Sequence, residues 1–286
     1  MQASPVSPAT RVAVTLAFLA ALSGACDRSV PAPSARVSRI VSLVPAATEI
    51  LFALGAGDLV VGRSKWCDTP AAARALPAVG DALSVDLEGL LGLGPDLIVT
   101  GGGAQREALG PLAGRVRIVT ALPETLDDVR ATITGLATLA GREEAGRDLV
   151  ARIDAALAAA RERAGSRGGR RTLFAVQHEP LVVAGAGSIV GELLDALGTR
   201  NLAGDLHRPW PQMSLESVVA RDPEAIVDAA VNDPREPSEF WGRFGTLTAV
   251  REGRVRRFPD PSLLRPGPRV PELLAAIEDA VFGEGR

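Results

Sequence analysis

The sequence contains no tyrosine, only two histidines and only three tryptophans in 286 residues. Nucleophilic catalysis needs a nucleophile, a base and an orienting acid that can meet. His178 and His207 are the only candidate histidine bases, and neither a Gly-x-Ser-x-Gly elbow nor a phosphate-binding Gly-x-x-x-x-Gly-Lys-Ser/Thr loop is present. The two histidines also lack the spacing of a zinc site. We therefore expect no catalytic residue, metal or cofactor, and a hydrolase that uses His178 is the alternative from another class.

Long apolar runs and an excess of basic charge are also missing. The chain is 47% hydrophobic and 23% charged with a net charge of -3, which is typical of a soluble globular protein and gives no reason to expect nucleic acid as a partner. Val12 to Leu22, behind Arg11, is too short to span a bilayer as a mature helix but fits the apolar region of an export signal. We expect the mature protein outside the cytoplasm, in the periplasm or at the cell surface.

Cysteine is scarce, and the first of the two cysteines follows this apolar run directly. The segment Leu22-Ser23-Gly24-Ala25-Cys26 resembles the lipobox of bacterial lipoproteins, in which the signal is cut before the cysteine and the cysteine is acylated. We expect a signal peptide over 1–25, lipidation at Cys26 and a Pro- and Ser-rich tether over 26–38. An ordinary signal cleaved nearby is the alternative. Cys67 would be an unpaired thiol, with a Cys26–Cys67 disulfide as the competing arrangement.

The strongest internal pattern is a repeat at an offset of 128 positions, between Val85–Val99 and the segment 208–227. Glu88 coincides with Glu216, and in each copy apolar residues at helical spacing lead to a proline and then to an apolar strand. Solenoid repeats recur every 20 to 50 residues or so, which is much shorter. The repeat therefore indicates two similar lobes, in agreement with the chain length.

Short strands and helices alternate in both halves, whereas the middle is helical. We expect an α/β fold with two Rossmann-like lobes, over 39–122 and 169–286, each with a central parallel sheet whose strand ends form the binding edge. The connecting segment, 123–168, should hold helices over Leu126–Ala140 and Glu143–Ala164. A helix of 22 residues is about 33 Å long, enough to run along both lobes, with the ligand cleft between them.

Two of the tryptophans lie in polar or proline-rich loops, one in each predicted lobe. Trp66 and Trp210 can offer flat faces to a large ligand, although each could instead anchor its own loop. Trp241, with Phe240 and Phe244 at helical spacing, is expected in the core. His178 and His207 could each line the cleft or be satisfied loop residues.

Five motifs are spread along the chain. They are Ser42-Leu43-Val44-Pro45-Ala46-Ala47-Thr48-Glu49, Trp66-Cys67-Asp68-Thr69-Pro70, Pro95-Asp96-Leu97-Ile98-Val99, Pro209-Trp210-Pro211-Gln212-Met213-Ser214 and Arg265-Pro266-Gly267-Pro268-Arg269. Together they resemble one protein family, the helical-backbone solute-binding proteins of ABC importers, which capture cobalamin, ferric siderophores or haem. The resemblance extends from about Arg39 to Phe282, and the Trp210 motif with the Trp66 loop is most similar to cobalamin-binding members.

The resemblance implies a ligand site between the lobes for cobalamin or a related corrinoid. Trp66 and Trp210 would press on the ligand from opposite lobes, with Asp260 and Arg265 as polar contacts. A ferric-siderophore or haem receptor of the same fold is the alternative, and four arginines keep the siderophore option open: Arg63, Arg106, Arg208 and Arg265. The predicted ligand-binding residues are Pro45, Ala46, Trp66, Gly101, His178, Trp210, Asp260 and Arg265.

The resemblance also assigns Glu88 and Glu216 to docking on arginines of the membrane permease. One carboxylate near a helix start in each lobe would suit a symmetric partner, although such acids also favour the helix dipole in their own right. The expected partners are a corrinoid and an ABC permease with its ATPase. Contact with the membrane is expected only through the N-terminal lipid, and the protein is expected to be a monomer.

Overall fold

The N-terminal sheet of the computed structural model is a four-stranded parallel sheet. The structure describes residues 36–165, 168–231 and 233–283. The strands β1 (Ile40–Ser42), β2 (Val60–Arg63), β3 (Leu97–Thr100) and β4 (Arg117–Thr120) lie in the order β2-β1-β3-β4. The central strands β1 and β3 are completely buried, as expected for a parallel sheet covered on both faces. The surrounding helices are α2 (Pro45–Ala53), η1 (Gly57–Leu59), η2 (Ala71–Ala75), α3 (Leu87–Gly92), α4 (Gly103–Ala108) and η3 (Gly110–Leu112).

The C-terminal sheet has the order β6-β5-β8-β9, with β7 also pairing to β5. Its strands are β5 (Arg171–His178), β6 (Leu181–Val183), β7 (Arg200–Asn201), β8 (Ala225–Asp228) and β9 (Val255–Arg257). Strand β8 pairs with β5 as β3 pairs with β1, so the sequence repeat reflects equivalent positions in two sheets. The helices of this part are α7 (Ile189–Ala196), α8 (Leu215–Arg221), α9 (Pro237–Trp241), α10 (Thr248–Arg251), η4 (Pro261–Leu264) and α11 (Val270–Phe282).

One strand departs from the expected parallel arrangement. Strand β6 runs antiparallel to β5, and only Glu179 and Pro180 connect the two strands. A parallel neighbour needs a crossover of a dozen or more residues, whereas a two-residue connection returns the chain as a hairpin. The C-terminal sheet thus has the expected parallel centre and, in addition, one antiparallel strand at its edge.

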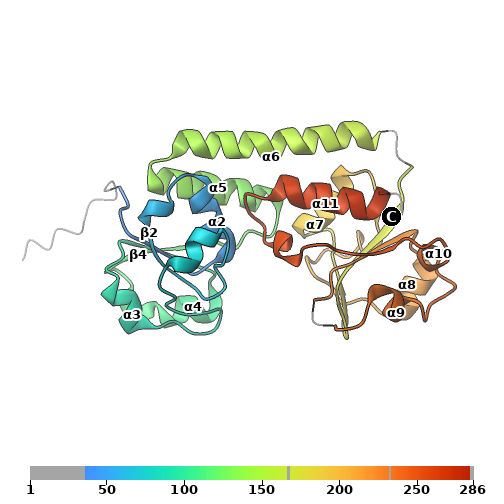
Figure 1. Cartoon of the computed structure of the whole chain (residues 1–286), viewed down its shortest axis with the longest axis horizontal. Helices are drawn as coiled ribbons and strands as arrows, with labels where there is room; N and C mark the ends of the chain where they lie inside the picture. Colours follow the sequence, from blue (N-terminus) through green and yellow to red (C-terminus); the bar gives the residue numbers. More distant parts are fainter. Residues whose placement is uncertain (1–35, 166–167, 232, 284–286) are drawn as a thin grey trace, which may run out of the picture. The chain divides into compact units, whose positions relative to one another are not determined.

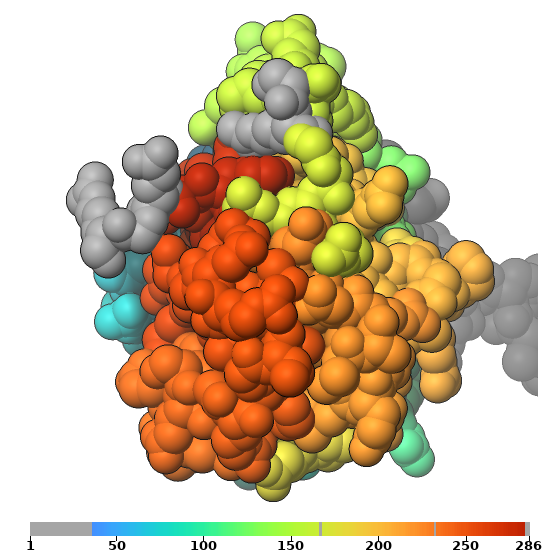
Figure 2. Space-filling view, turned by 90° about the vertical axis from the view of Figure 1, so that its right-hand side faces the viewer, coloured from blue at the N-terminus to red at the C-terminus, as the bar shows by residue number. Residues whose placement is uncertain are grey.

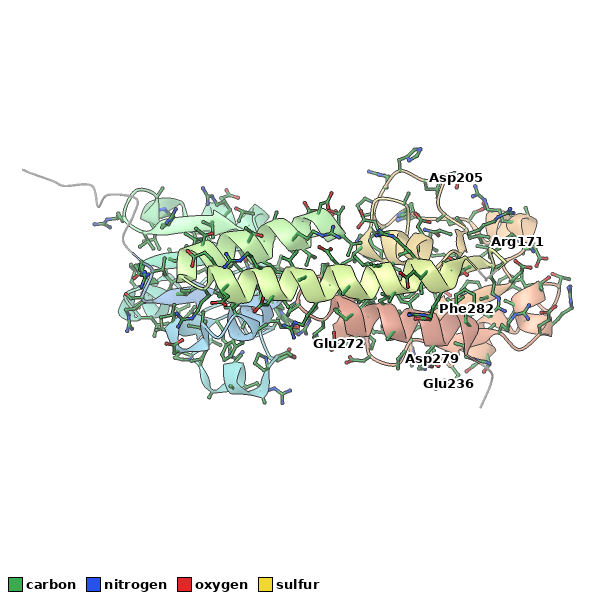
Figure 3. All side chains as sticks on the ribbon, turned by 90° about the horizontal axis from the view of Figure 1, so that it is seen from above. Arg171, Asp205, Glu236, Glu272, Asp279 and Phe282 are labelled. Atoms are coloured by element: carbon green, nitrogen blue, oxygen red, sulfur yellow. The ribbon has the colours of Figure 1, made fainter. Side chains whose placement is uncertain are left out.

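Two long helices connect the sheets. Helices α5 (Leu126–Ala140) and α6 (Glu143–Ala164) have the predicted bounds. Thr125 and Asp128 form a capping box at the start of α5, and Gly141 ends it with φ 64°. In Figure 1 helix α6 extends above both sheets, and from above it passes alongside α11 (Figure 3). Arg163 on α6 donates to Glu278 on α11 at 2.9 and 2.7 Å.

The described chain from Arg36 onward forms one compact unit around a shared core. The largest hydrophobic cluster includes Ile40 of the first sheet, Ile153 of α6 and Phe174 of the second sheet. The end-on view in Figure 2 shows α6 on top, above α11, with the orange residues of the C-terminal part below. Trp241 is completely buried, as predicted. The expected two-lobed α/β fold class is thus confirmed.

Several predictions concern residues outside the described part of the chain. The signal peptide over 1–25, Cys26 and most of the tether belong to this group. None of the helices in the described ranges is both long and apolar enough to cross a bilayer. The lobe boundaries stay predictions.

Candidate functional site

The first wall of the candidate site is a cavity of about 310 Å³ at the carboxyl ends of β1 and β3. Trp66 lines it, with 53% of the residue exposed, and Leu122 is 61% exposed on the same cavity. Two other predicted ligand-binding residues, Pro45 and Gly101, line it as well. The remaining lining residues are Leu43, Val44, Ser64, Ala82, Gly102 and Gln105. This wall is mainly apolar.

Gln105 of α4 holds the loops of this cavity together. Its Oε1 accepts hydrogen bonds from the Gly101 N–H at 2.9 Å and the Thr100 hydroxyl at 3.1 Å. Its Nε2 donates to the carbonyl oxygens of Asp81 at 2.7 Å and Leu43 at 3.4 Å. The amide is buried and fully used, so Gln105 is structural in the wall. We missed it in the sequence, because its partners come from three separate loops.

The Trp66 ring has a charged neighbour. Lys65 Nζ lies 5.2 Å from the ring centroid and donates to Asp81 Oδ2 at 2.6 Å. Lys65, together with the backbone N–H groups of Leu83 and Ser84, holds the pKa of Asp81 well below its usual range. The ion pair therefore restrains the loop that carries Trp66.

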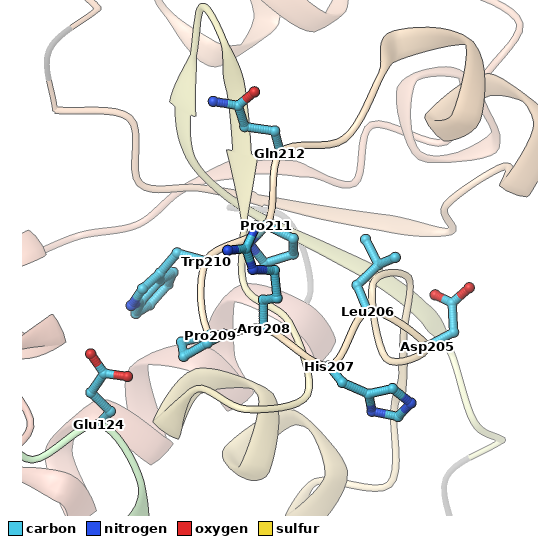
Figure 4. A pocket seen from close by; sticks show the side chains of 9 residues that line it. All are labelled: Glu124, Asp205, Leu206, His207, Arg208, Pro209, Trp210, Pro211 and Gln212. Atoms are coloured by element: carbon cyan, nitrogen blue, oxygen red, sulfur yellow. The ribbon is translucent and has the colours of Figure 1, made fainter.

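The second wall is a cavity of about 880 Å³ around the loop 205–212. Figure 4 shows Trp210 and Glu124 on the same side of this cavity, while His207 points to the opposite side of the loop. Trp210 is 36% exposed. Gly185 fits closely under this loop, since a Cβ there would lie 2.1 Å from the Arg208 carbonyl oxygen. The two tryptophans thus line separate cavities, one in each lobe.

His178 is held between two carboxylates and makes an internal contact network. Its Nε2 lies 2.7 Å from Asp228 Oδ2 and its Nδ1 lies 2.6 Å from Asp233 Oδ2. The ring stacks on Phe240 with centroids 3.8 Å apart, and its side chain is 2% exposed. His178 touches a cavity of about 600 Å³ with Gln177, Glu179, Ala230, Asp233, Pro234 and Arg235, but neither ring nitrogen is free to bind a ligand. His207 is exposed.

Asp260 and Arg265 belong to an ion-pair cluster between the lobes. Arg265 Nη1 donates to Asp68 Oδ1 at 2.6 Å and lies 3.7 Å from Glu49 Oε1. Arg269 binds both oxygens of Glu49, at 2.7 and 3.0 Å. Asp260 caps η4 by accepting from the Ser262 N–H. The hydrogen bond from Arg265 lowers the pKa of Asp68.

The start of α2 places two predicted ligand-binding residues, Pro45 and Ala46, in different surroundings. The helix begins at Pro45, where proline occupies the first position without cost because its missing N–H would have no partner there. Ala46 is 5% exposed and lies against Gly267, where a Cβ would come within 3.6 to 3.8 Å of its atoms. Pro45 therefore faces the first cavity, whereas Ala46 packs against the segment before α11.

Glu88 and Glu216 occupy the same position in equivalent helices. Each is the second residue of its helix, α3 or α8, and each is exposed. The helices begin with side-chain caps, in which Asp86 accepts from the Gly89 N–H and Ser214 from the Ser217 N–H. Hydrogen bonds from its own N–H and from Ser214 lower the pKa of Glu216.

Of the arginines that kept an anionic siderophore possible, two donate to backbone carbonyls and one lines the second cavity. Arg63 donates to four backbone carbonyls, and Arg106 donates to the Ile118 carbonyl beside another cavity. Arg208 lines the second cavity and is exposed, and its side chain forms no hydrogen bond or ion pair within the described ranges. No group of three metal-ligating side chains gathers among the described residues.

Cys67 is completely buried below the Trp66 loop. Its thiol lies 3.1 Å from the Ser64 hydroxyl and donates to the Ser42 carbonyl at 3.5 Å. The thiol is free within the described residues, and Cys26, the other partner of the alternative disulfide, lies outside them.

Known proteins resemble the chain along most of its length. The periplasmic binding protein family model matches residues 40–261. A vitamin B12-binding protein of Pectobacterium atrosepticum is 31% identical over 239 residues, which cover 80% of this chain and 84% of that protein. The periplasmic vitamin B12-binding protein of Vibrio cholerae superimposes with a TM-score of 0.72 at 27% identity, over 86% of this chain and 96% of its own. A periplasmic haem-binding protein from Roseiflexus gives a TM-score of 0.71 at 29% identity, over 85% and 99%.

Proposed function

The chain belongs to the periplasmic binding protein family, and from that premise we propose that it captures cobalamin or a related corrinoid between its lobes and delivers it to the permease of an ABC importer. The similarity to vitamin B12-binding proteins in sequence and in fold supports this ligand. The role is that of a carrier and not of an enzyme.

The observation that carries the proposal is the pair of exposed tryptophans, one on a cavity of each lobe. Trp66 stands on an apolar wall, and Trp210 stands beside polar groups such as Glu124 and Gln212. A corrin ring is large, flat and mainly apolar, with amide arms around its edge. Aromatic faces and a few placed hydrogen bonds suit such a ligand. Nanomolar binding corresponds to about 12 kcal/mol, and lobes held by a shared core have little motion to lose on binding.

Delivery is proposed to use Glu88 and Glu216. Both carboxylates are exposed at the second position of equivalent helices, so they offer a symmetric partner two equivalent charges. Leu91 and Val219, each three residues further on, are 51% and 42% exposed, which adds an apolar contact beside each charge. Charges of this kind orient docking more than they add affinity. ATP-driven motion of the permease would then separate the lobes and release the ligand.

A haem receptor is the second candidate, and the haem-binding neighbour favours it. The chain has no tyrosine to bind iron, and we take its two histidines as the candidate iron ligands. Both nitrogens of His178 already contact carboxylates, and His207 points away from Trp210 in Figure 4. This geometry favours the corrinoid. It also weakens the alternative of a hydrolase that uses His178, because both ring nitrogens already contact carboxylates.

We further propose that the protein is exported, acts as a monomer and is anchored through a lipid on Cys26. Mass spectrometry of the protein extracted from membranes would detect the acyl chains. Cys26→Ser should release the protein in soluble form, and retention of that variant in the membrane would contradict the anchor.

The decisive experiment is calorimetric titration of the purified protein with cyanocobalamin, with haemin in a parallel cell. We expect saturable one-to-one binding of cyanocobalamin below about micromolar concentration and weaker binding of haemin. Binding of haemin alone would replace the corrinoid with haem.

A further inference from the structure

We propose that Asp68 sets the charge selectivity of the ligand site by pairing with Arg265, so that this point of the site accepts neutral hydrogen-bond acceptors such as amide carbonyls and disfavours carboxylates. The inference rests on the proposed function, because it takes the ligand to lie between the lobes. It names Asp68 as a specificity-determining residue.

Asp68 is close to Trp66 in the sequence, and its side chain connects the two lobes. It lies two residues after Trp66, which lines the first cavity. Its carboxylate, with 46% of the side chain exposed, accepts from Arg265 Nη1 at 2.6 Å, across a separation of 197 residues. Arg265 comes directly after η4 in the C-terminal part of the chain. The pair therefore joins the two lobes, two residues along the chain from Trp66.

Arg265 keeps donors for a ligand even though its charge is compensated. Nη1 lies 2.6 Å from Asp68 and 3.7 Å from Glu49, whereas Nε and Nη2 donate to no residue within the described ranges. Only 26% of the side chain is exposed, so these groups reach a limited part of the site. A ligand that meets Arg265 would thus find N–H donors but no excess positive charge.

A carboxylate at this point would meet repulsion. It would have to share Arg265 with Asp68, or displace Asp68 and leave that anion without its partner. Glu49, buried and bound by Arg269, faces the same guanidinium from α2, and Asp260 lies 4.0 Å from Arg269. Arg74 is the other cation at Asp68, but it is exposed and donates to the backbone carbonyl. A neutral amide carbonyl accepts from Arg265 without this repulsion.

The chemical class that follows is a macrocycle with an uncharged amide edge. The peripheral amides of cobalamin fulfil this condition, whereas haem carries two propionates and many siderophores carry carboxylates. The same fold could therefore accept anionic ligands when the position of Asp68 is neutral. Selectivity between these ligands would then depend on the Asp68 carboxylate and not on Trp66 or Trp210.

The test compares two corrinoids that share one ring, cobyrinic acid with carboxylate arms and its heptaamide, and adds haemin as a dianionic macrocycle. Each is titrated against the wild type, Asp68→Asn and Asp68→Asn/Arg265→Gln. We expect the wild type to bind the heptaamide at least about tenfold more tightly than the acid, and Asp68→Asn to narrow that ratio about tenfold. Haemin should bind more tightly to Asp68→Asn than to the wild type. In the double variant, the affinity for the acid and the affinity for haemin should both fall below those of Asp68→Asn, since both increases require the charge of Arg265.

Asp58→Asn is the matched control. Asp58 is an exposed carboxylate on η1 of the same lobe and forms no ion pair with another described residue, so its loss should leave all affinity ratios unchanged. The inference would be overturned if Asp68→Asn kept the wild-type ratio of heptaamide affinity to acid affinity. It would also be overturned if the double variant kept the higher affinity for the acid and for haemin. If the wild type binds haemin but neither corrinoid, the corrinoid proposal fails while the effect of Asp68→Asn on haemin still decides the inference. A wild type that binds none of the three overturns both.

Discussion

The guanidinium of Arg269 binds both carboxylate oxygens of Glu49, with Nε–Oε2 and Nη2–Oε1 distances of 2.7 and 3.0 Å. Glu49 belongs to α2 beside the first sheet, and Arg269 directly precedes α11 beside the second. The Glu49 side chain is 3% exposed and that of Arg269 is 22% exposed. A fork-to-fork pair with this much burial is geometrically specific, so it fixes one lobe against the other.

We expect Glu49→Gln to lower the free energy of unfolding by about 3 kcal/mol, because it removes the nearest counter-charge of a largely buried guanidinium. Urea unfolding followed by circular dichroism measures the change. Asp154→Ala is the control: Asp154 pairs with Arg130 on the surface, and its loss should cost less than about 1 kcal/mol. Equal losses in the two variants would contradict a special role for the pair between the lobes.

Trp66→Ala and Trp210→Ala should each weaken cyanocobalamin binding by about 1 to 3 kcal/mol, because each removes an aromatic face from one wall. Calorimetry suits this measurement, since it does not depend on the fluorescence that the substitution removes. Leu91→Ala, an exposed apolar residue that lines no described cavity, should bind as the wild type does. Unchanged affinity in either tryptophan variant would remove that residue from the site.

Local patterns in the sequence predicted a large part of the fold. The helical patterns over Leu126–Ala140 and Glu143–Ala164 predicted α5 and α6 with the bounds that the structure has, because this signal lies within the segments that it determines. The strand β7 is two residues long and α10 is four, and neither has room for a period. Elements this short depend on tertiary contacts, and sequence periodicity does not predict them.

The site could be predicted only where a residue type is informative alone. Trp66 and Trp210 are conspicuous in polar loops, and both line cavities. The engagement of His178 could not be foreseen, because Asp228 and Asp233 lie 50 and 55 residues away from it. The sequence holds many aspartates at such distances, and only the pairing of β5 with β8 selects these two.

Replacing both Glu88 and Glu216 by alanine should leave ligand affinity intact and reduce uptake by whole cells or by a reconstituted transporter. The two carboxylates line no described cavity, whereas their equivalent places in α3 and α8 suit a partner with two equivalent arginine sites. The control replaces Glu143 and Glu144 by alanine. Both lie at the start of α6, and Figure 1 shows this helix on the opposite side of the molecule from α3. Normal uptake by the Glu88/Glu216 double variant would exclude these residues from docking.

Acid should weaken the fold through the His178 cluster. Hydrogen bonds from Arg235 and then from His178 hold the pKa of Asp233 well below its usual range. An aspartate with a lowered folded-state pKa contributes stability above its unfolded value of about 4, and this contribution is lost as the pH falls through the lower folded-state value. We therefore expect Asp233→Asn to be less stable than the wild type at pH 7 and to lose less stability between about pH 5 and pH 2. Urea unfolding across this pH range measures the difference, with Asp58→Asn as the control. If Asp233→Asn and the wild type lost equal free energy of unfolding as the pH falls, Asp233 would make no contribution to the acid dependence.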